Sequence, residues 1–127
     1  GEVRVIKMTT ACDAGVLIHP QNVEGQLHGG MDMGAGFALR EAYVAGKTKD
    51  WRTFPYPSMK TAFDMETILL ETPRKRGTNG AVGVGEMTMV PTAPAVINAI
   101  HNACGIWVTE LPATREKIQA AWAAKGS

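Results

Sequence analysis

The sequence predicts a small α+β domain in which short strands pack with two or three helices. Three observations carry this prediction: the length of 127 residues, the 45% content of hydrophobic residues, and an alternation of strand-like with helix-like apolar segments. This length suits one core, so we expect residues 1–127 to be a single domain. The hydrophobic content, with 20% charged residues, is typical of a folded chain.

Charge and cysteine content narrow the classes of function. Thirteen basic and twelve acidic residues leave a net charge of +1, so no overall field favours nucleic acid or an anionic membrane. The two cysteines, Cys12 and Cys104, permit at most one disulfide and form no Cys-x-x-Cys pattern for zinc or iron–sulfur. We expect both to be small buried apolar side chains. Because no apolar run reaches 18 residues and no signal peptide is visible, we expect a cytoplasmic protein.

The first elements are a strand and a long helix. Residues 2–12 alternate as a strand does, and a turn is expected at 13–15. Pro20 then ends a short apolar piece at 16–18, and a helix is expected over 23–43 with Asn22 as its N-cap. Its apolar stripe contains Val23, Leu27, Met31, Ala38 and Ala42.

This expected helix carries an unusual number of glycines. The chain has 14 glycines, and five of them lie here: Gly25, Gly29, Gly30, Gly34 and Gly36. Each interior glycine costs a helix about 0.5–1 kcal/mol relative to alanine. A helix is therefore expected only if another backbone or a ligand closely approaches its smooth face; the alternative is that the segment is partly a loop.

The rest of the chain alternates loops with shorter elements. Residues 47–60 are polar and interrupted by prolines, which predicts an exposed loop, and residues 67–71 form a second expected strand. The basic turn at 73–77 is expected to be solvated, because no aromatic residues interleave its charges.

Two further helices are expected near the C-terminus. The first is capped by Thr92 and ended by Gly105, and its apolar face contains Val96, Ile97, Ile100, Ala103 and Cys104. The second starts at 112–114, and Ile118, Ala121 and Trp122 are expected to face inward.

The first candidate site is the segment Gly80-x-x-Gly83-x-Gly85-Glu86. Glycines let a backbone come within contact distance of a ligand and expose its N–H groups. The spacing is neither the dinucleotide fingerprint nor a P-loop, and an acid directly after the last glycine would repel a phosphate. A carboxylate held by such a loop is better suited to proton abstraction. The alternative is that Glu86 is an ordinary surface or capping glutamate.

The second candidate is the segment from Asn22 to Gly30. A helix start that combines Asn22 and Gln26 with bare glycines offers amide groups and the positive end of the helix dipole to a polar or phosphate-containing ligand. The alternative is a capped helix that packs closely through its glycines. His28 is expected to be a solvated or hydrogen-bonded side chain.

Three stretches occur in a characteristic order: Asp13-Ala-Gly15 through Gly29-Gly30; Gly83-Val84-Gly85-Glu86; and Pro91-Thr-Ala-Pro-Ala95 through Leu111-Pro112. Together they resemble the C-terminal part of the molybdenum-binding subunit of the xanthine dehydrogenase and aldehyde oxidoreductase family, the bacterial aldehyde oxidoreductases most closely. The set covers nearly the whole chain, which begins with Gly1 and is expected to be a partial domain, about the last sixth of such a subunit. His19, Val82 and Met65 depart from residues found in many members.

The resemblance implies an oxidoreductase that oxidises aldehydes, or hydroxylates N-heterocycles such as xanthine, with water as the oxygen source. It implies molybdenum on a molybdopterin, with the cytosine dinucleotide form favoured, and no metal ligand from the protein. Glu86 matches the family's general base, and Asn22, Gln26, Gly83, Val84 and Gly85 match cofactor contacts. The implied partners are the remainder of the molybdenum-binding subunit and an iron–sulfur domain or subunit, without nucleic acid or membrane. Alone, the segment is expected to be inactive.

Two other hypotheses stay open at this point. One is a stand-alone, non-catalytic binding or structural module of the same ancestry. The other is an unrelated nucleotide-binding α/β domain.

Overall fold

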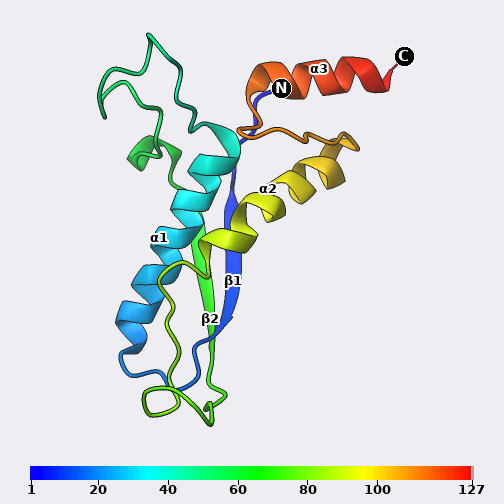
Figure 1. The fold of residues 1–127 in the computed structure, drawn as a ribbon. Coiled ribbons are helices and arrows are strands. Elements are labelled where there is room, and N and C mark those ends of the chain that lie inside the picture. The colour runs from blue at the N-terminus through cyan, green and yellow to red at the C-terminus, as the bar shows by residue number, and fades with distance from the viewer. Residues whose placement is uncertain (127) are drawn as a thin grey trace.

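The computed structural model describes residues 1–126 and confirms the α+β class. The elements in chain order are β1 (Lys7–Asp13), α1 (Pro20–Leu39), a short 3-10 helix η1 (Met59–Thr61), β2 (Asp64–Leu70), α2 (Met89–Cys104) and α3 (Arg115–Lys125). Helix α1 runs along the strands, α2 packs on α1, and α3 lies at the far end near the N-terminus (Figure 1).

The sheet consists of the two strands β1 and β2, which pair in parallel with Lys7 opposite Asp64 and Asp13 opposite Leu70. Both strands alternate in exposure, as strands with one buried face do. The first strand is shorter than the expected 2–12, because residues 1–6 have no partner strand within the described chain. The second begins before the expected 67–71, because its polar first residues pair with the start of β1.

Helix α1 is continuous despite its glycines, so the partly looped alternative is wrong. A Cβ built on Gly30 would lie 2.7 Å from the Thr88 Cβ, and one on Gly34 would lie 2.5 Å from the Thr92 Cβ. Both distances are shorter than side-chain atoms tolerate, so these two glycines let α2 approach α1 closely. The expected close approach of another backbone is thus the reason that the helix keeps them.

The boundaries of α1 correct two expectations. The helix starts at Pro20, with His19 and not Asn22 as its N-cap: the Nδ1 atom of His19 accepts a hydrogen bond from the Asn22 backbone N–H at 3.1 Å. Proline suits this first position because the N–H that it lacks would have no helical partner. The helix ends at Leu39 and not at residue 43, so Ala42 lies outside it. Leu27, Met31 and Ala38 are buried as expected.

Helix α2 starts earlier than the sequence suggested. Thr92 is not its N-cap but a buried residue inside the helix, and its hydroxyl donates to the Thr88 carbonyl at 2.8 Å. Gly105 ends the helix in the left-handed conformation, with φ of 68°, as expected. Thr114 caps α3, where Ile118 is buried; Trp122, which was expected to face inward, is 56% exposed.

The core consists of two clusters. The larger joins the end of α1 to α2 and α3, and the smaller joins β1 to the first half of α1 through Cys12, Ala14 and Leu27. Cys12 and Cys104 are both free thiols; Cys12 is buried and Cys104 is half-buried, which fits the expected apolar role.

Candidate functional site

The glycine-rich segment 80–86 is joined at its start to the turn that follows β1. Gly15 and Ala81 form an antiparallel bridge, the Val16 N–H donates to the Gly80 carbonyl at 3.0 Å, and the Val82 N–H donates to the Ala14 carbonyl at 3.1 Å. A Cβ on Gly15, whose φ is 65°, would collide with the Gly80 carbonyl oxygen. Glycine is therefore required where these two segments meet.

The middle of the segment is fixed by one side chain. Val84 is half-buried and packs on the smaller core cluster beside Val23 and Leu27 of α1. On either side of it, a Cβ built on Gly83 or Gly85 would meet nothing within 4 Å. The segment therefore touches the core through Val84 and leaves its backbone open to its surroundings at the two glycines.

Glu86 lies between two anchored positions. Val84, two residues before it, packs on the smaller core cluster. Met87 follows it, and the Met87 sulfur accepts a hydrogen bond from the Cys12 thiol at 3.5 Å. Thr88 is buried and packs on Gly30. The backbone carbonyl of Glu86 accepts from the Met89 N–H at 3.1 Å, at the start of α2. The Glu86 side chain is exposed, and no hydrogen bond or ion pair within residues 1–126 uses its carboxylate. The backbone of Glu86 is thus anchored, and its carboxylate is exposed and unpaired among the described residues.

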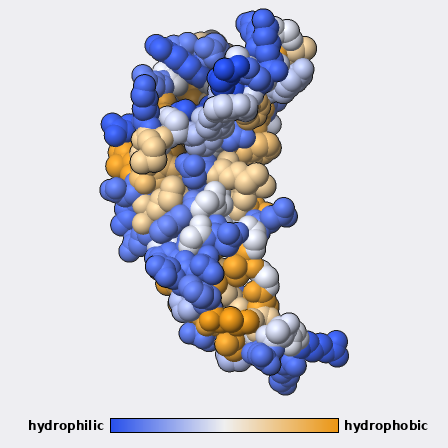
Figure 2. Space-filling view, turned by 90° about the vertical axis from the view of Figure 1, so that its left-hand side faces the viewer, coloured by the Kyte–Doolittle hydropathy of each residue, from blue (hydrophilic) through white to orange (hydrophobic). Residues whose placement is uncertain are grey.

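The other predicted residues lie on the first turns of α1. Asn22 and Gln26 are both exposed, and Gln26 directly precedes Leu27, a member of the buried cluster on which Val84 packs. One cluster thus contacts both the glycine segment and the first half of α1, although the two segments are far apart in sequence. Asn22 lies one turn nearer the start of the helix. Hydrophobic side chains gather toward the lower end of this side of the molecule, where α1 begins (Figure 2).

The backbone of the glycine segment offers unused donors. No hydrogen bond among the described residues uses the N–H groups of Gly83, Val84, Gly85 or Glu86. Four consecutive free amides beside open glycines are suited to a ligand rich in polar acceptor atoms.

Asp13 was noted from the sequence only as part of a turn and of the family pattern, but it also supports the site. Its Oδ1 atom accepts from the backbone N–H groups of Gly15 and Thr72, both at 3.0 Å, and its Oδ2 atom pairs with Arg74 at 3.2 Å. Hydrogen bonding from Thr72, then from Gly15, lowers the pKa of Asp13. The turn pattern Asp-Ala-Gly indicated the local contact, but the contacts with residues 72 and 74 depend on the fold.

Within residues 1–126, no group of three His, Cys, Asp or Glu side chains is arranged to hold a metal ion. None of the helices described there is long and apolar enough to span a membrane.

Comparisons with known proteins give the family. Residues 1–62 match the molybdopterin cofactor-binding domain family. The chain is 34% identical to a probable xanthine dehydrogenase subunit of Bacillus subtilis, an alignment that covers 99% of the chain and 17% of that protein. This chain belongs to the molybdopterin-binding family.

The solved structures agree with this assignment. The aldehyde oxidoreductase of Desulfovibrio desulfuricans superposes with a TM-score of 0.91 at 41% identity, covering 95% of this molybdopterin-binding chain and 14% of that protein. The aldehyde oxidoreductase of Desulfovibrio gigas gives a TM-score of 0.92 at 33% identity, with 97% and 14% covered. The fold is that of a fragment of the molybdenum-cofactor-binding domain of these enzymes. The chain spans about a sixth of the length of its Bacillus subtilis relative.

Proposed function

We propose that this chain is the C-terminal part of the molybdenum-binding subunit of a hydroxylase that oxidises an aldehyde, or hydroxylates an N-heterocycle, with water as the oxygen source. The observation that carries the proposal is the placement of Glu86: an exposed carboxylate on a backbone anchored on both sides, beside open glycines and unpaired amides. The names of the relatives, xanthine dehydrogenase and aldehyde oxidoreductase, give the reaction class.

The residues present suit a molybdopterin. Such a ligand is rich in polar acceptor atoms, and the free N–H groups of Gly83, Val84 and Gly85 can donate to it. A Cβ at Gly83 or Gly85 would stand in the space that the ligand needs, whereas the bare backbone leaves it open. The amide side chains of Asn22 and Gln26 are exposed on α1 and can bind the more distant polar part, for which we favour a cytosine dinucleotide. The proposal requires no metal ligand from this chain.

The chain's own part in the reaction is to accept a proton. When bound, the cofactor would supply the two-electron oxidation, with iron–sulfur clusters elsewhere in the enzyme as the proposed electron acceptors. A carboxylate oxygen of Glu86 accepts the proton released as the water-derived oxygen becomes a nucleophile, which is general base catalysis. Val84, Met87 and Thr88 hold the backbone on either side of Glu86, which limits the positions that its carboxylate can reach.

The test is Glu86→Gln in the complete enzyme, with Glu110→Gln as the matched control. Glutamine keeps the shape of the side chain but cannot accept the proton, so we expect unchanged molybdenum content and a turnover lower by about 10²–10⁴-fold or more. Glu110 is exposed in the loop before α3, and we expect its variant to keep normal turnover. A loss of less than about tenfold in the Glu86 variant would show that Glu86 is not the base.

A further inference from the structure

The helical layer of the molecule is wider than its sheet. Helix α1 packs against both strands and against α2, whereas the backbones of β1 and α2 do not come close to each other within the described chain. In a two-layer domain, each helix buries its apolar face on the layer opposite. Helix α2 buries part of its face on α1 and part on Ile118 of α3, and Val3, Val5 and Met8 pack against the same cluster. The only strands in the described part of the chain are β1 and β2, and neither lies directly under α2.

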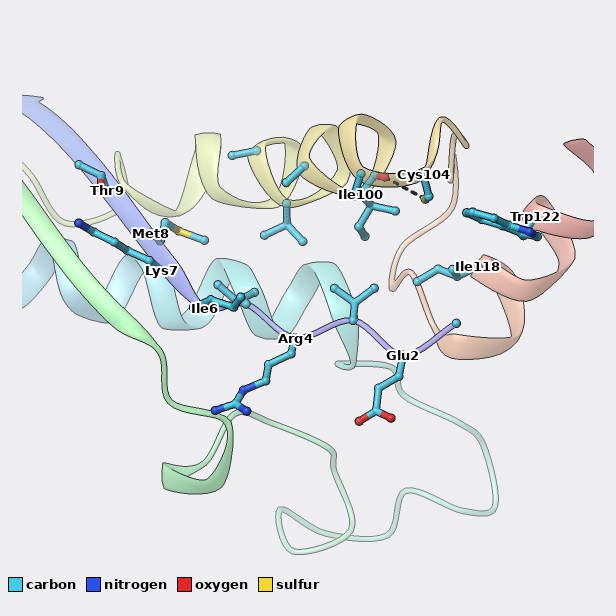
Figure 3. A pocket seen from close by; sticks show the side chains of 17 residues that line it. Glu2, Arg4, Ile6, Lys7, Met8, Thr9, Ile100, Cys104, Ile118 and Trp122 are labelled. Atoms are coloured by element: carbon cyan, nitrogen blue, oxygen red, sulfur yellow. Dashed lines mark hydrogen bonds between the residues drawn. The ribbon is translucent and has the colours of Figure 1, made fainter.

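An open apolar groove lies where a further strand under α2 would be. It has a volume of about 770 Å³ and runs along residues 1–9, between this segment and the α2 residues Ala95, Ala99 and Ala103. Met8 lies on one side of the groove and Ile100 and Ile118 lie on the other, with Trp122 at one end (Figure 3). Nine extended residues span about 30 Å, so the groove has the length of a β-strand and not of a compact ligand.

The edge of β1 that faces away from β2 has free hydrogen-bonding groups. The Asp64 N–H donates to the Ile6 carbonyl, and the Ala14 N–H donates to the Leu70 carbonyl, so the even-numbered residues of β1 turn their backbone groups toward β2. Because these groups alternate along a strand, those of Lys7, Thr9 and Ala11 point to the other edge. No hydrogen bond in the described part of the chain uses them. Lys7 and Thr9 line the groove.

We propose that a β-strand from the remainder of the molybdenum-binding subunit pairs with this edge of β1 and buries apolar side chains against α2. The row of unpaired backbone groups can pair with an extended segment, and the apolar groove beside it can bury apolar side chains. Both features therefore fit an extended segment with one apolar face. The inference rests on the proposed function only for the source of the strand. The relatives that share this fold are several times longer than the chain, so they contain ample sequence to supply it.

The test compares residue-resolved hydrogen exchange of β1 in the isolated chain and in the complete subunit. In the isolated chain, the amides of Met8, Thr10 and Cys12 should be protected by β2, and those of Lys7, Thr9 and Ala11 should exchange quickly. In the complete subunit, we expect the second set to become at least about tenfold slower, with the first set as the internal control. Unchanged exchange of the odd-numbered amides would overturn the proposal.

A pair of variants tests the α2 side of the groove. Ala99→Arg places a long charged side chain in the groove, and Asn98→Arg places the same side chain on the preceding residue of α2, which does not line it. Both positions are exposed and arginine favours helices, so the isolated chain should unfold at the same temperature in both variants. Only Ala99→Arg should abolish the protection of Lys7 and Thr9 in the subunit.

Two other results would count against the proposal. If Ala99→Arg keeps the full protection, the strand does not lie against α2. If the isolated chain dimerises and protects the same amides, the occupant is a second copy. Because exchange is read whether or not the enzyme turns over, an active Glu86→Gln variant would overturn the proposed function and leave this result standing.

Discussion

Two adjacent glycines of α1 have opposite surroundings, and this makes them a matched pair of test sites. A Cβ on Gly30 would lie 2.7 Å from the Thr88 Cβ and 3.1 Å from the Met89 nitrogen, whereas one on Gly29 would meet nothing within 4 Å. We expect Gly30→Ala to lower the free energy of unfolding by about 1–3 kcal/mol, because α2 must move away. Gly29→Ala should raise it by about 0.5–1 kcal/mol, through helix propensity alone.

Urea unfolding of the isolated chain measures both values. Equal stabilisation by the two alanines would show that α1 and α2 are farther apart than the structure has them. In the complete enzyme, Gly30→Ala should also lower turnover, because Thr88 stands two residues after Glu86.

Asp13 gives a prediction on pH. Hydrogen bonds from Thr72 and Gly15, with the charge of Arg74, lower the pKa of Asp13 from its ordinary value of 3.8. A carboxyl group whose folded pKa is lowered stabilises the fold above its unfolded pKa, and this stabilisation is lost as the pH falls through the folded value. We therefore expect Asp13→Asn to melt at a lower temperature than the wild type at pH 7, with the difference shrinking below about pH 4.

Thermal unfolding between pH 2 and pH 7 checks this expectation. Asp50→Asn is the control, because the pKa of Asp50 is also lowered but its hydrogen bonds stay within the loop at 50–53. A melting difference for Asp13→Asn that does not change with pH would show that the carboxylate charge contributes nothing.

Among the helices and strands, the features that depend on local residue patterns were predicted correctly from the sequence. The periodic apolar residues Leu27, Met31 and Ala38 indicated α1, and Gly105 indicated the end of α2. The caps of α1 and α2 were predicted wrongly. Asn22 and Thr92 are good capping residues by type, but Pro20 starts α1 earlier, and the packing of Thr88 on Gly30 fixes the start of α2.

In the candidate site too, the local features were predictable from the sequence and the contacts between distant residues were not. The glycine spacing around Glu86 indicated a backbone with open N–H groups, and no hydrogen bond among the described residues uses those of Gly83 to Glu86. Its supports, such as the contact between Cys12 and Met87, join residues far apart in sequence and follow from no local pattern. Trp122 was expected to face inward with Ile118 and Ala121, but it is exposed at a groove that only the assembled elements create.

At the scale of the whole molecule, the described chain supplies one side of the proposed site. Glu86, Gln26 and Asn22 are all exposed, and the backbone between Gly83 and Glu86 donates to no other described residue. A ligand that is contacted on a single side buries much less of its surface than ligands in binding sites usually do. We therefore expect the isolated chain, purified from cells that make the cofactor, to contain no molybdenum and to oxidise no aldehyde.

Metal analysis and a dye-reduction assay with an aldehyde substrate test this expectation, with the complete enzyme as the positive control. Molybdenum at about one atom per chain would show that these 127 residues hold the cofactor alone, and the proposal of a partial site would then fail.

The parallel pairing of β1 and β2 also bears on how the chain folds. Residues 14–63, including all of α1, must be arranged before the two strands can meet. Closing a flexible loop of that length costs roughly 3–4 kcal/mol of chain entropy, so the strands gain little until α1 has formed and shortened the path between them. The sheet should therefore form late, and its rate of formation should follow the helix stability of α1. The glycine-rich helix α1 would then determine the rate at which the two-stranded sheet forms.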